Sequence, residues 1–431
     1  MAEAPLATEY YRATSPGVGY PALEGTIDAA VCVIGGGFAG LSTALALAER
    51  GASDIVVLEA HSVGHGASGR NGGFVFGGFS LGERSIIDTV GEENARKLYH
   101  MTLAAVERIR SRIHQFGIEC ELREEGVYLA NWFDDERILE RQARFMADKL
   151  GVQWQRVSRA QLAEKIASER YFGALFEPDA FHFHPLKYAQ GLARVLVAKG
   201  VRVFEGSKVA QIAADGALWR IATAGGQVCA RDVVVCCGGY IDKLYPRLGG
   251  AVLPIATYVM VTEPLGDRLQ GAMRTGAAVY DTRFAFDYYR PLADTRLLWG
   301  GRISILERSS AAVARLLYGD MLKVYPQLAG ARVDYAWSGM MSYARHKMPQ
   351  LGRLPDGIWY GMGFGGHGVA PTTLAGEVLA AAIMGGGAGA GADEELARFT
   401  HWGLPSTGGP AGLLAAQLAY WYYDLRDWMR Q

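Results

Sequence analysis

The chain has 431 residues, which is long enough for a large core and for two domains of ordinary size. Lys and Arg number 43 and Asp and Glu 44, a balance that argues against nucleic-acid binding and against attraction to an anionic membrane. No run of about 18 apolar residues occurs, and no basic segment precedes an apolar one at the start, so we expect neither a membrane span nor a secretory signal. The 5 cysteines include no CxxC pair, which predicts a reducing, cytoplasmic setting without structural disulfides or a metal site.

Residues 29–59 are typical of a nucleotide-binding βαβ unit. An apolar run at 31–34 predicts a strand, the apolar spacing within 41–47 predicts a helix, and 55–58 predicts a second strand. The first turn carries the GxGxxG spacing, whose glycines allow a tight turn, close approach of a pyrophosphate and close packing of helix on strand. The cofactor contacts expected in this turn are Gly35, Gly37, Phe38, Ala39 and Gly40.

An acid, Glu59, ends the second predicted strand. A carboxylate at this position accepts hydrogen bonds from the ribose hydroxyls of a dinucleotide. Its charge would repel a 2′-phosphate, so NADP is not the expected nucleotide. The helix N-terminus offers unpaired N–H groups to the phosphates. We therefore take Glu59 and Ala60 as cofactor contacts; a glycine-rich structural turn, the alternative, does not account for the acid.

A second glycine-rich loop, residues 64–76, follows this unit directly. Its accessible backbone N–H groups and one arginine suit a second anionic or polar part of the ligand. A flexible surface linker is the alternative, but an apolar run follows the loop instead of more polar sequence. The contacts expected here are Gly66, Ala67, Ser68, Arg70, Asn71, Gly72 and Gly73.

These motifs, GGGFAG at 35–40 and GASGRNGG at 66–73, resemble the FAD signature of the D-amino-acid oxidase-like family of flavoproteins. Segments 181–206, 231–240 and 288–302 resemble later parts of that family, and IWYGMGFGGHGVAPTTLAGEVLAAAI at 358–383 resembles its carboxy-terminal flavin loop and helix. The γ-glutamylputrescine oxidase-like branch is the most similar. The resemblance implies FAD as cofactor and adds Val209 and Gly238 to its expected contacts.

The fold class that follows is α/β, with a Rossmann-like FAD-binding domain of the glutathione reductase type and a mixed-sheet α+β substrate domain. We expect a discontinuous FAD-binding domain at 28–85, 155–245 and 335–395. Insertions at 86–154 and 246–334 then form the substrate domain. Residues 396–431 predict a helical tail docked on the body in preference to a membrane anchor.

The carboxy-terminal motif also makes physical sense from its residues. A short strand at 358–360 leads into a glycine loop, and a helix begins near Val369, with a proline tolerated in its first turn. Backbone N–H groups of Gly365, Gly366 and His367 are candidate donors to the flavin C2 carbonyl, where they would stabilise the charge of reduced flavin. Gly368 and Val369 complete this set. The alternative for His367 is a loop histidine satisfied by one backbone hydrogen bond.

The expected chemistry is hydride transfer from the carbon beside an amine to flavin N5, followed by hydrolysis of the imine to an aldehyde. Such chemistry depends on positioning and on a neutral amine more than on a dedicated base. Catalytic residues are accordingly not assigned, with His367 and Tyr289 as candidates. A γ-glutamyl-amine or other alkylamine is the predicted substrate.

Some members of the family hold a substrate carboxylate with an arginine and a lysine, and by the same spacing this chain has Phe76 and Ala370. This difference disfavours small amino acids, although an amino-acid or N-methyl amino-acid oxidase or dehydrogenase stays the alternative. A non-catalytic flavoprotein subunit of a larger redox complex is an alternative of another class.

The electron acceptor can be oxygen or another molecule, because the lysine that activates oxygen in some members of the family is replaced near Leu298 in this chain. No cysteine follows Cys237 to form the covalent flavin link of some members. His65 is another conceivable anchor, but noncovalent FAD is expected.

Candidates for the substrate pocket come from two stretches rich in aromatic residues. Aromatic walls would exclude water, and Arg290 or Arg345 can meet a distal carboxylate. Core packing is the alternative for each aromatic residue, and an ion pair is the alternative for each arginine. The candidates are Tyr258, Tyr288, Tyr289, Arg290, Trp337, Met341, Tyr343 and Arg345.

Overall fold

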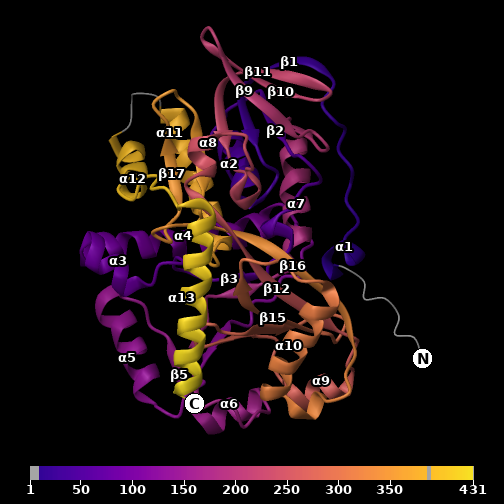
Figure 1. Cartoon of the computed structure of the whole chain (residues 1–431), viewed down its shortest axis with the longest axis vertical. Helices are drawn as coiled ribbons and strands as arrows, with labels where there is room; N and C mark the ends of the chain where they lie inside the picture. Colours follow the sequence, from indigo (N-terminus) through magenta and orange to yellow (C-terminus); the bar gives the residue numbers. More distant parts are fainter. Residues whose placement is uncertain (1–8, 386–389, 431) are drawn as a thin grey trace.

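The computed structural model describes residues 9–385 and 390–430, and in this part of the chain two eight-stranded sheets dominate. Figure 1 shows one sheet in the upper half of the molecule, around β1 and β11, and the other below it, around β12, β15 and β16. The upper sheet is called the nucleotide sheet and the lower one the substrate sheet.

The nucleotide sheet has the order β17-β18-β11-β1-β2-β8, and a hairpin of β9 and β10 extends from the first half of β11. Strands β18, β11, β1, β2 and β8 run parallel, as the βαβ pattern predicts. The strands are β1 (Gly25–Ile34), β2 (Ile55–Leu58), β8 (Arg202–Phe204), β9 (Val209–Asp215), β10 (Leu218–Thr223), β11 (Gly226–Val235), β17 (Gln350–Arg353) and β18 (Trp359–Met362).

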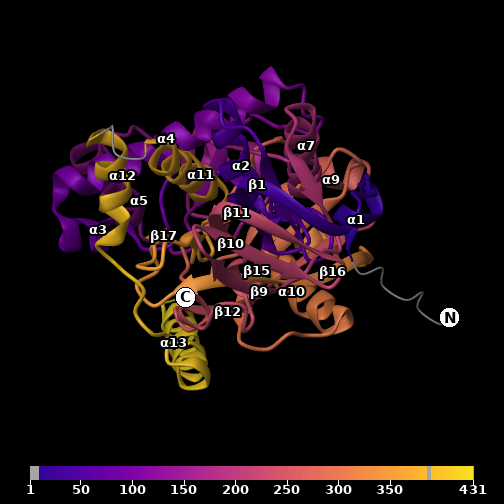
Figure 2. The same ribbon diagram turned by 90° about the horizontal axis from the view of Figure 1, so that it is seen from above.

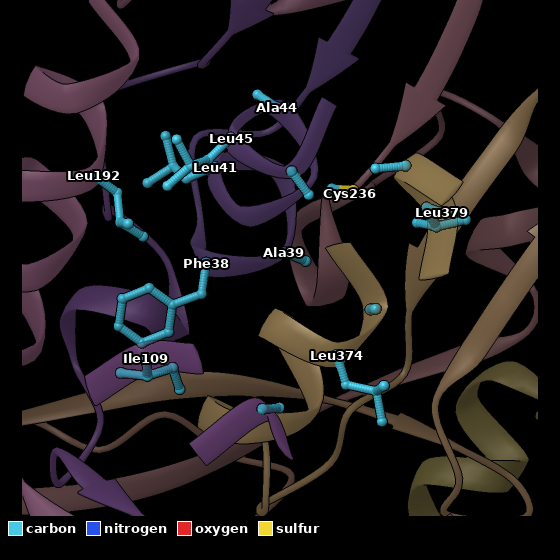
Figure 3. Packing of buried hydrophobic residues seen from close by; sticks show 14 of the residues in the cluster. Phe38, Ala39, Leu41, Ala44, Leu45, Ile109, Leu192, Cys236, Leu374 and Leu379 are labelled. Atoms are coloured by element: carbon cyan, nitrogen blue, oxygen red, sulfur yellow. The ribbon is translucent and has the colours of Figure 1, made fainter. Parts of the chain in front are cut away.

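Helices α2 (Phe38–Glu49), α4 (Glu92–Gln115), α7 (Pro185–Ala198) and α11 (Val369–Gly385) pack their apolar side chains together against this sheet. Figure 3 shows Leu41 and Leu45 of α2 with Ile109 of α4, Leu192 of α7 and Leu374 of α11 in one core. Burial of such side chains is the main stabilising term of the domain.

The substrate sheet has the order β16-β12-β15-β14-β13-β4-β6-β5 and is antiparallel except between β13 and β4. Helix α10 (Ser310–Val324) covers one face, where its apolar residues join a second core. The strands are β4 (Val127–Ala130), β5 (Gln155–Val157), β6 (Ala174–Glu177), β12 (Val252–Thr262), β13 (Ala278–Asp281), β14 (Tyr288–Pro291), β15 (Leu297–Ser304) and β16 (Val333–Ala344).

Strand pairing and helix packing differ from the expected division into domains in three places. Strands β5 and β6 lie in the substrate sheet, although 155–245 was assigned to the FAD-binding domain. Strand β16 pairs with β12 along its whole length, although 335–395 was assigned to the same domain. Conversely, α4 of the first insertion buries its apolar stripe against the nucleotide core. These assignments depend on partners distant in sequence, which periodicity does not reveal.

The remaining elements are short or peripheral. A two-stranded ribbon joins β3 (Phe74–Val75) to β7 (Phe181–His182). The other helices are α1 (Tyr10–Thr14), α3 (Glu83–Val90), α5 (Arg137–Phe145), α6 (Arg159–Lys165), α8 (Pro246–Gly249), α9 (Asp267–Ala272), α12 (Ala390–Thr400) and α13 (Gly409–Met429). The single-turn helices are η1 (Ala67–Gly69), η2 (Met146–Leu150), η3 (Gly238–Tyr240) and η4 (Pro326–Leu328).

The tail forms α12 and then α13, which lies along the body at the front of Figure 1 and at the lower edge of Figure 2. The Asp427 carboxylate accepts a hydrogen bond from the backbone N–H of Phe284 at 2.6 Å. Gln417 Oε1 accepts from the Ile305 N–H at 3.1 Å.

Among the described helices, none combines the length and hydropathy needed to cross a bilayer. All five cysteines are free, and Cys32 and Cys236 are buried.

Candidate active site

A cavity of about 1620 Å³ lies between the two sheets. Its walls include the carboxyl ends of β1, β2 and β11, parts of β12 to β16, and one face of α13. Pockets for one small molecule usually measure about 300–1,000 Å³, so this cavity has room for a dinucleotide together with a substrate. The carboxyl ends of parallel strands are also where sheets of this kind bind ligands.

The first glycine turn forms part of this wall. Gly35 has φ 114°, in the left-handed region that favours glycine, and a Cβ atom there would lie 2.7 Å from a backbone oxygen just after β11. A Cβ atom at Gly40 would lie 1.9 Å from the Gly35 carbonyl oxygen. Gly35, Gly37, Phe38 and Ala39 line the cavity, whereas Gly40 does not, because it packs α2 on β1. Gly40 is therefore a packing residue and not a lining residue.

Glu59 stands at the carboxyl end of β2 and, with Ala60, lines the cavity. Its carboxylate accepts hydrogen bonds from the backbone N–H groups of Gly36 at 2.7 Å and His61 at 2.9 Å. Burial raises the pKa of Glu59, and these two N–H groups oppose the rise. Each carboxylate oxygen keeps a lone pair for a further donor, such as a ribose hydroxyl.

The second glycine loop lies against the first. Ser68 Oγ accepts a hydrogen bond from the Phe38 N–H at 2.8 Å, which ties the loop to the start of α2. Gly73 does not line the cavity, because the space beside it is filled: a Cβ atom there would lie 2.1 Å from the Phe183 carbonyl oxygen. The predicted contacts that do line the cavity are Gly66, Ala67, Ser68, Arg70, Asn71 and Gly72, together with Val209 and Gly238.

Arg70 carries a donor that the described residues leave without a partner. One guanidinium NH2 group pairs with Glu9 at 2.8 Å, but Nε is buried and makes no hydrogen bond within the described part of the chain. A buried, unpaired donor is costly, and an acceptor on a ligand in the cavity would satisfy it. The backbone around Arg70 is held by Trp337, whose Nε1 donates to the Arg70 carbonyl oxygen at 3.0 Å.

His65, the conceivable covalent anchor, lines the same end of the cavity as Glu59. Its ring stacks on His61, with centroids 4.0 Å apart, and Nδ1 lies 3.0 Å from Arg12. Burial and the neighbouring charges lower the pKa of His65 to about 4. His65 therefore lies beside the residues that follow Glu59, the acid of the βαβ unit.

The carboxy-terminal loop and α11 begin where the sequence predicts, and Gly365, Gly366, His367, Gly368 and Val369 line the cavity. Two of the three predicted backbone donors are already used. The Gly365 N–H donates to the Ser342 carbonyl oxygen at 2.7 Å, and the His367 N–H donates to Ser80 Oγ at 3.1 Å. The third, the Gly366 N–H, has the Tyr343 hydroxyl as its neighbour; burial raises the pKa of Tyr343, and this backbone hydrogen bond opposes the larger effect of burial.

His367 lies where it could contact a flavin, and it also has the backbone partner that the alternative interpretation predicts. Its ring lines the cavity, and Nε2 lies 3.4 Å from the Phe76 carbonyl oxygen. The Phe76 ring stands edge-on to it, with centroids 4.3 Å apart. Burial lowers the pKa of His367 to about 4, so the imidazole is neutral near pH 7.

Tyr258, Tyr289, Arg290 and Trp337, predicted for the substrate pocket, are buried and do not line the cavity. Tyr289 stacks on Trp299 with centroids 4.3 Å apart, on the core side of β14. Successive residues of a strand face opposite sides, so Tyr288 lines the cavity while Tyr289 does not. These four predictions are corrected to structural positions.

Arg290 supports the second glycine loop from behind. Its Nε donates to the Gly72 carbonyl oxygen at 2.6 Å, and its Nη1 lies 3.4 Å from His182 Nδ1. Leu298, which was compared with an oxygen-activating lysine, is buried with Val259 and Val261 and does not line the cavity. That position therefore says nothing about the acceptor. Tyr288, Met341, Tyr343 and Arg345 do line the cavity.

The polar lining residues that the sequence did not indicate include Glu83, Tyr99, Glu177 and Tyr280. These four come from α3, α4, β6 and β13, so no local motif unites them. The only available signal was an acid that follows a short apolar run, at position 177. The helical tail was predicted, but the contribution of α13 to the cavity was missed: Gln417, Tyr420 and Tyr423 are among its lining residues.

The cavity fits FAD on three counts. The glycine turns leave backbone at its surface where a Cβ atom would collide, a buried acid follows β2 where ribose would be held, and Arg70 Nε is a buried donor without a partner among the described residues. The dinucleotide would lie along 35–39, 59–60 and 66–72, with its ring end toward 365–369. The arrangement is that of an enzyme that holds a dinucleotide beside a second ligand.

Comparison with known proteins supports this conclusion. The family model of FAD dependent oxidoreductases called DAO matches residues 30–382. Gamma-glutamylputrescine oxidoreductase of Escherichia coli (strain K12) is 37% identical over 421 residues, which cover 95% of each chain. Probable oxidoreductase OrdL of Haemophilus influenzae is 35% identical over 429 residues, covering 97% of this chain and 96% of the relative.

Among solved structures, glycine oxidase from Geobacillus kaustophilus matches with a TM-score of 0.68 at 23% sequence identity, covering 83% of this chain and 95% of that one. This likeness concerns the fold. The family that the motifs predicted is confirmed: the chain belongs to the DAO family of FAD-dependent oxidoreductases.

Proposed function

We propose that the enzyme oxidises the C–N bond of a γ-glutamyl-amine or another alkylamine to an imine, which water hydrolyses to an aldehyde. The carrying observation is the chemistry of the cavity wall around Phe76. Aromatic rings and the carboxyl groups of Glu83 and Glu177 are among the lining residues, and neither Phe76 nor Ala370 supplies the positive charge that a small amino acid's carboxylate needs. The 37% identity with a gamma-glutamylputrescine oxidoreductase supports the same substrate class.

FAD, when bound, supplies the acceptor for the hydride that leaves the carbon beside the amine. The residues of this chain would bind and orient the cofactor and the substrate. The glycine turns and Glu59 hold the dinucleotide, and Arg70 offers its unpaired donor. His367 carries no charge near pH 7, so it does not repel an approaching ammonium ion.

The aromatic rings shape an apolar channel for the chain of an amine. Phe76 stacks parallel to Tyr280 with centroids 5.4 Å apart, and Phe74 stands edge-on to Tyr288 at 5.5 Å. Such walls exclude water from the reacting carbon and contact methylene groups. Arg345 is exposed on the cavity lining and is our candidate partner for a distal carboxylate, such as that of a γ-glutamyl group.

The test is anaerobic reduction of the purified, FAD-loaded enzyme, followed as bleaching of the flavin absorbance. We expect bleaching with γ-glutamylputrescine or a simple alkylamine, and little with sarcosine, glycine or D-alanine. The rate should rise with pH until the substrate amine is neutral, because only the free lone pair assists departure of the hydride. Fast bleaching by a small amino acid would overturn the substrate class.

Two further measurements address the alternatives. Turnover of the isolated chain with an artificial electron acceptor is expected for an enzyme, and its absence would favour a non-catalytic subunit. Reoxidation of the bleached enzyme by air, compared with reoxidation by a quinone or dye, separates an oxidase from a dehydrogenase.

A further inference from the structure

Four polar side chains from distant parts of the chain converge beside Phe76. Glu83 begins α3, Tyr99 lies in α4, Glu177 ends β6 and Tyr280 lies in β13, and all four line the cavity. We call them the acid–tyrosine cluster. The Tyr280 hydroxyl donates a hydrogen bond to Glu177 Oε1 at 2.6 Å.

The space beside Gly78 shows how closely part of the cluster gathers. A Cβ atom placed at Gly78 would lie 3.2 Å from Glu83 Oε1, 3.6 Å from Tyr99 Cε2 and 3.6 Å from His367 Cε1. Glu83 and Tyr99 therefore flank the histidine that follows the glycine loop 361–366. The same histidine contacts Phe76, whose ring stacks on Tyr280.

The hydrogen-bonding capacity of this cluster is largely unused. Glu177 is 5% exposed and Tyr99 is 3% exposed, so both are nearly shielded from bulk water. Within the described residues, Tyr280 is the hydrogen-bond partner of Glu177, and neither Glu83 nor Glu177 forms an ion pair. The Tyr99 hydroxyl lines the cavity without a hydrogen-bond partner in the same part of the chain. Burying carboxylates without a cation is costly, so a ligand that brings the cation would be favoured.

The surroundings suit a cation with an apolar stem. Phe76 and Tyr280 line the cavity, and aromatic rings of this kind can offer negative π density to an ammonium ion and apolar contact to methylene groups. The nearby Arg283 does not neutralise the cluster, because its guanidinium is already held by Asp281 at 2.6 Å and Asp287 at 2.7 Å. Burial also raises the pKa of Glu177 to about 8, as expected for a carboxyl group that lacks a cationic partner.

We propose that the acid–tyrosine cluster of Glu83, Tyr99, Glu177 and Tyr280 is the binding site for the ammonium end of the amine substrate. The proposal deepens the proposed function and rests on it. It identifies the form that first binds as an alkylammonium ion recognised by carboxylates; this ion must lose a proton before the hydride leaves. In this enzyme acidic residues would recognise the amine of the substrate. Basic residues could not recognise a substrate carboxylate at the positions of Phe76 and Ala370, because these two residues carry no charge.

The test uses three probes of nearly the same shape and different charge: tert-butylammonium, tert-butanol and pivalate. The carbon beside nitrogen in tert-butylammonium bears no hydrogen, so the FAD-loaded enzyme can bind this ion without oxidising it. Binding is measured by calorimetry and by perturbation of the flavin spectrum at pH 8.5, roughly where Glu177 is ionised in most molecules. We expect the cation to bind at least about tenfold more tightly than the alcohol, and pivalate to bind least.

Variants locate the site. Glu177→Gln and Glu83→Gln should each weaken tert-butylammonium about 10- to 100-fold and change tert-butanol little, because only the charge is removed. Tyr99→Phe should weaken it less. Glu124→Gln is the matched control: its side chain is 43% exposed and pairs with Arg110, away from the cavity lining, so affinity should not change. Retained FAD and a cooperative thermal transition show which variants are folded, and Glu83→Gln carries the test if Glu177→Gln does not fold.

Equal binding of the three probes by the wild type, or undiminished cation binding by both folded acid variants, would overturn the proposal. The proposed function fails separately. If amines bleach the flavin but the probes show no preference for charge, the ammonium site is wrong and amine oxidation stands. If the cation preference disappears in the variants but no amine bleaches the wild type, the site stands and the proposed function is wrong.

Discussion

Replacing Glu59 by alanine should loosen FAD without unfolding the protein. In the protein the carboxylate accepts hydrogen bonds from the N–H groups of Gly36 and His61, at 2.7 and 2.9 Å, and it lines the cavity where ribose is expected. The variant therefore loses a charged acceptor for the ribose hydroxyls and leaves two backbone donors without a side-chain partner. The two losses have different consequences and can be measured separately.

The loss of the hydrogen bonds to ribose has the larger effect. A hydrogen bond to a charged group contributes on the order of 1.5–3 kcal/mol, which corresponds to roughly a 10- to 150-fold loss of FAD affinity. The two backbone donors border a cavity large enough for water, so hydration offsets much of their loss in the FAD-free protein. We expect the free energy of unfolding of that form to fall by only about 1 kcal/mol.

The assay is reconstitution of FAD-free protein, with the Kd taken from quenching of flavin fluorescence and stability taken from urea unfolding. Glu205 provides a matched control, because its carboxylate also accepts two backbone N–H groups, of Tyr20 at 2.9 Å and Val63 at 2.6 Å, but does not line the cavity. Glu205→Ala should lower stability and leave the Kd unchanged. An unchanged Kd for Glu59→Ala would refute the placement of ribose beside this acid.

Three further outcomes are expected. Gly40→Ala should lower the free energy of unfolding by about 1–3 kcal/mol or more, because the new Cβ atom would lie 1.9 Å from a backbone oxygen. Gly319→Ala is the control: this glycine faces open space within α10, so the substitution should raise the free energy of unfolding slightly in the same thermal or urea melts. Burial raises the pKa of Glu177 from 4.5 to about 8, so its ionisation destabilises the fold as pH rises through this interval. Glu177→Gln should therefore gain stability relative to the wild type between pH 5 and about 8.5, and a difference that does not vary with pH would contradict this. Acid precipitation should release the flavin into solution; flavin retained in the pellet would indicate a covalent link, with His65 as the first residue to examine by peptide mapping.

Local sequence was sufficient to predict the nucleotide-binding parts of this protein. The glycine spacing around Gly35 and Gly40 reports backbone geometry directly, since one residue needs a positive φ and the other has a backbone oxygen where a side chain would stand. The acid at Glu59, the loop at 66–72 and the start of α11 at Val369 are also set by neighbours within a few residues. Apart from Gly40, which packs α2 on β1, each of these features lies on the cavity wall and was predicted from contiguous residues alone.

Tertiary structure decided the rest, because it depends on partners far apart in the chain. Pairing of β16 with β12 moved a predicted part of the FAD-binding domain into the substrate sheet. The direction of one strand decided that Tyr288 faces the cavity and Tyr289 the core, and strand pattern alone does not say which face is covered. The Gly365 amide was lost as a flavin donor because a distant strand supplies its acceptor. The acid–tyrosine cluster comes from four separate elements, so its existence is a property of the packed sheets and of no segment of sequence.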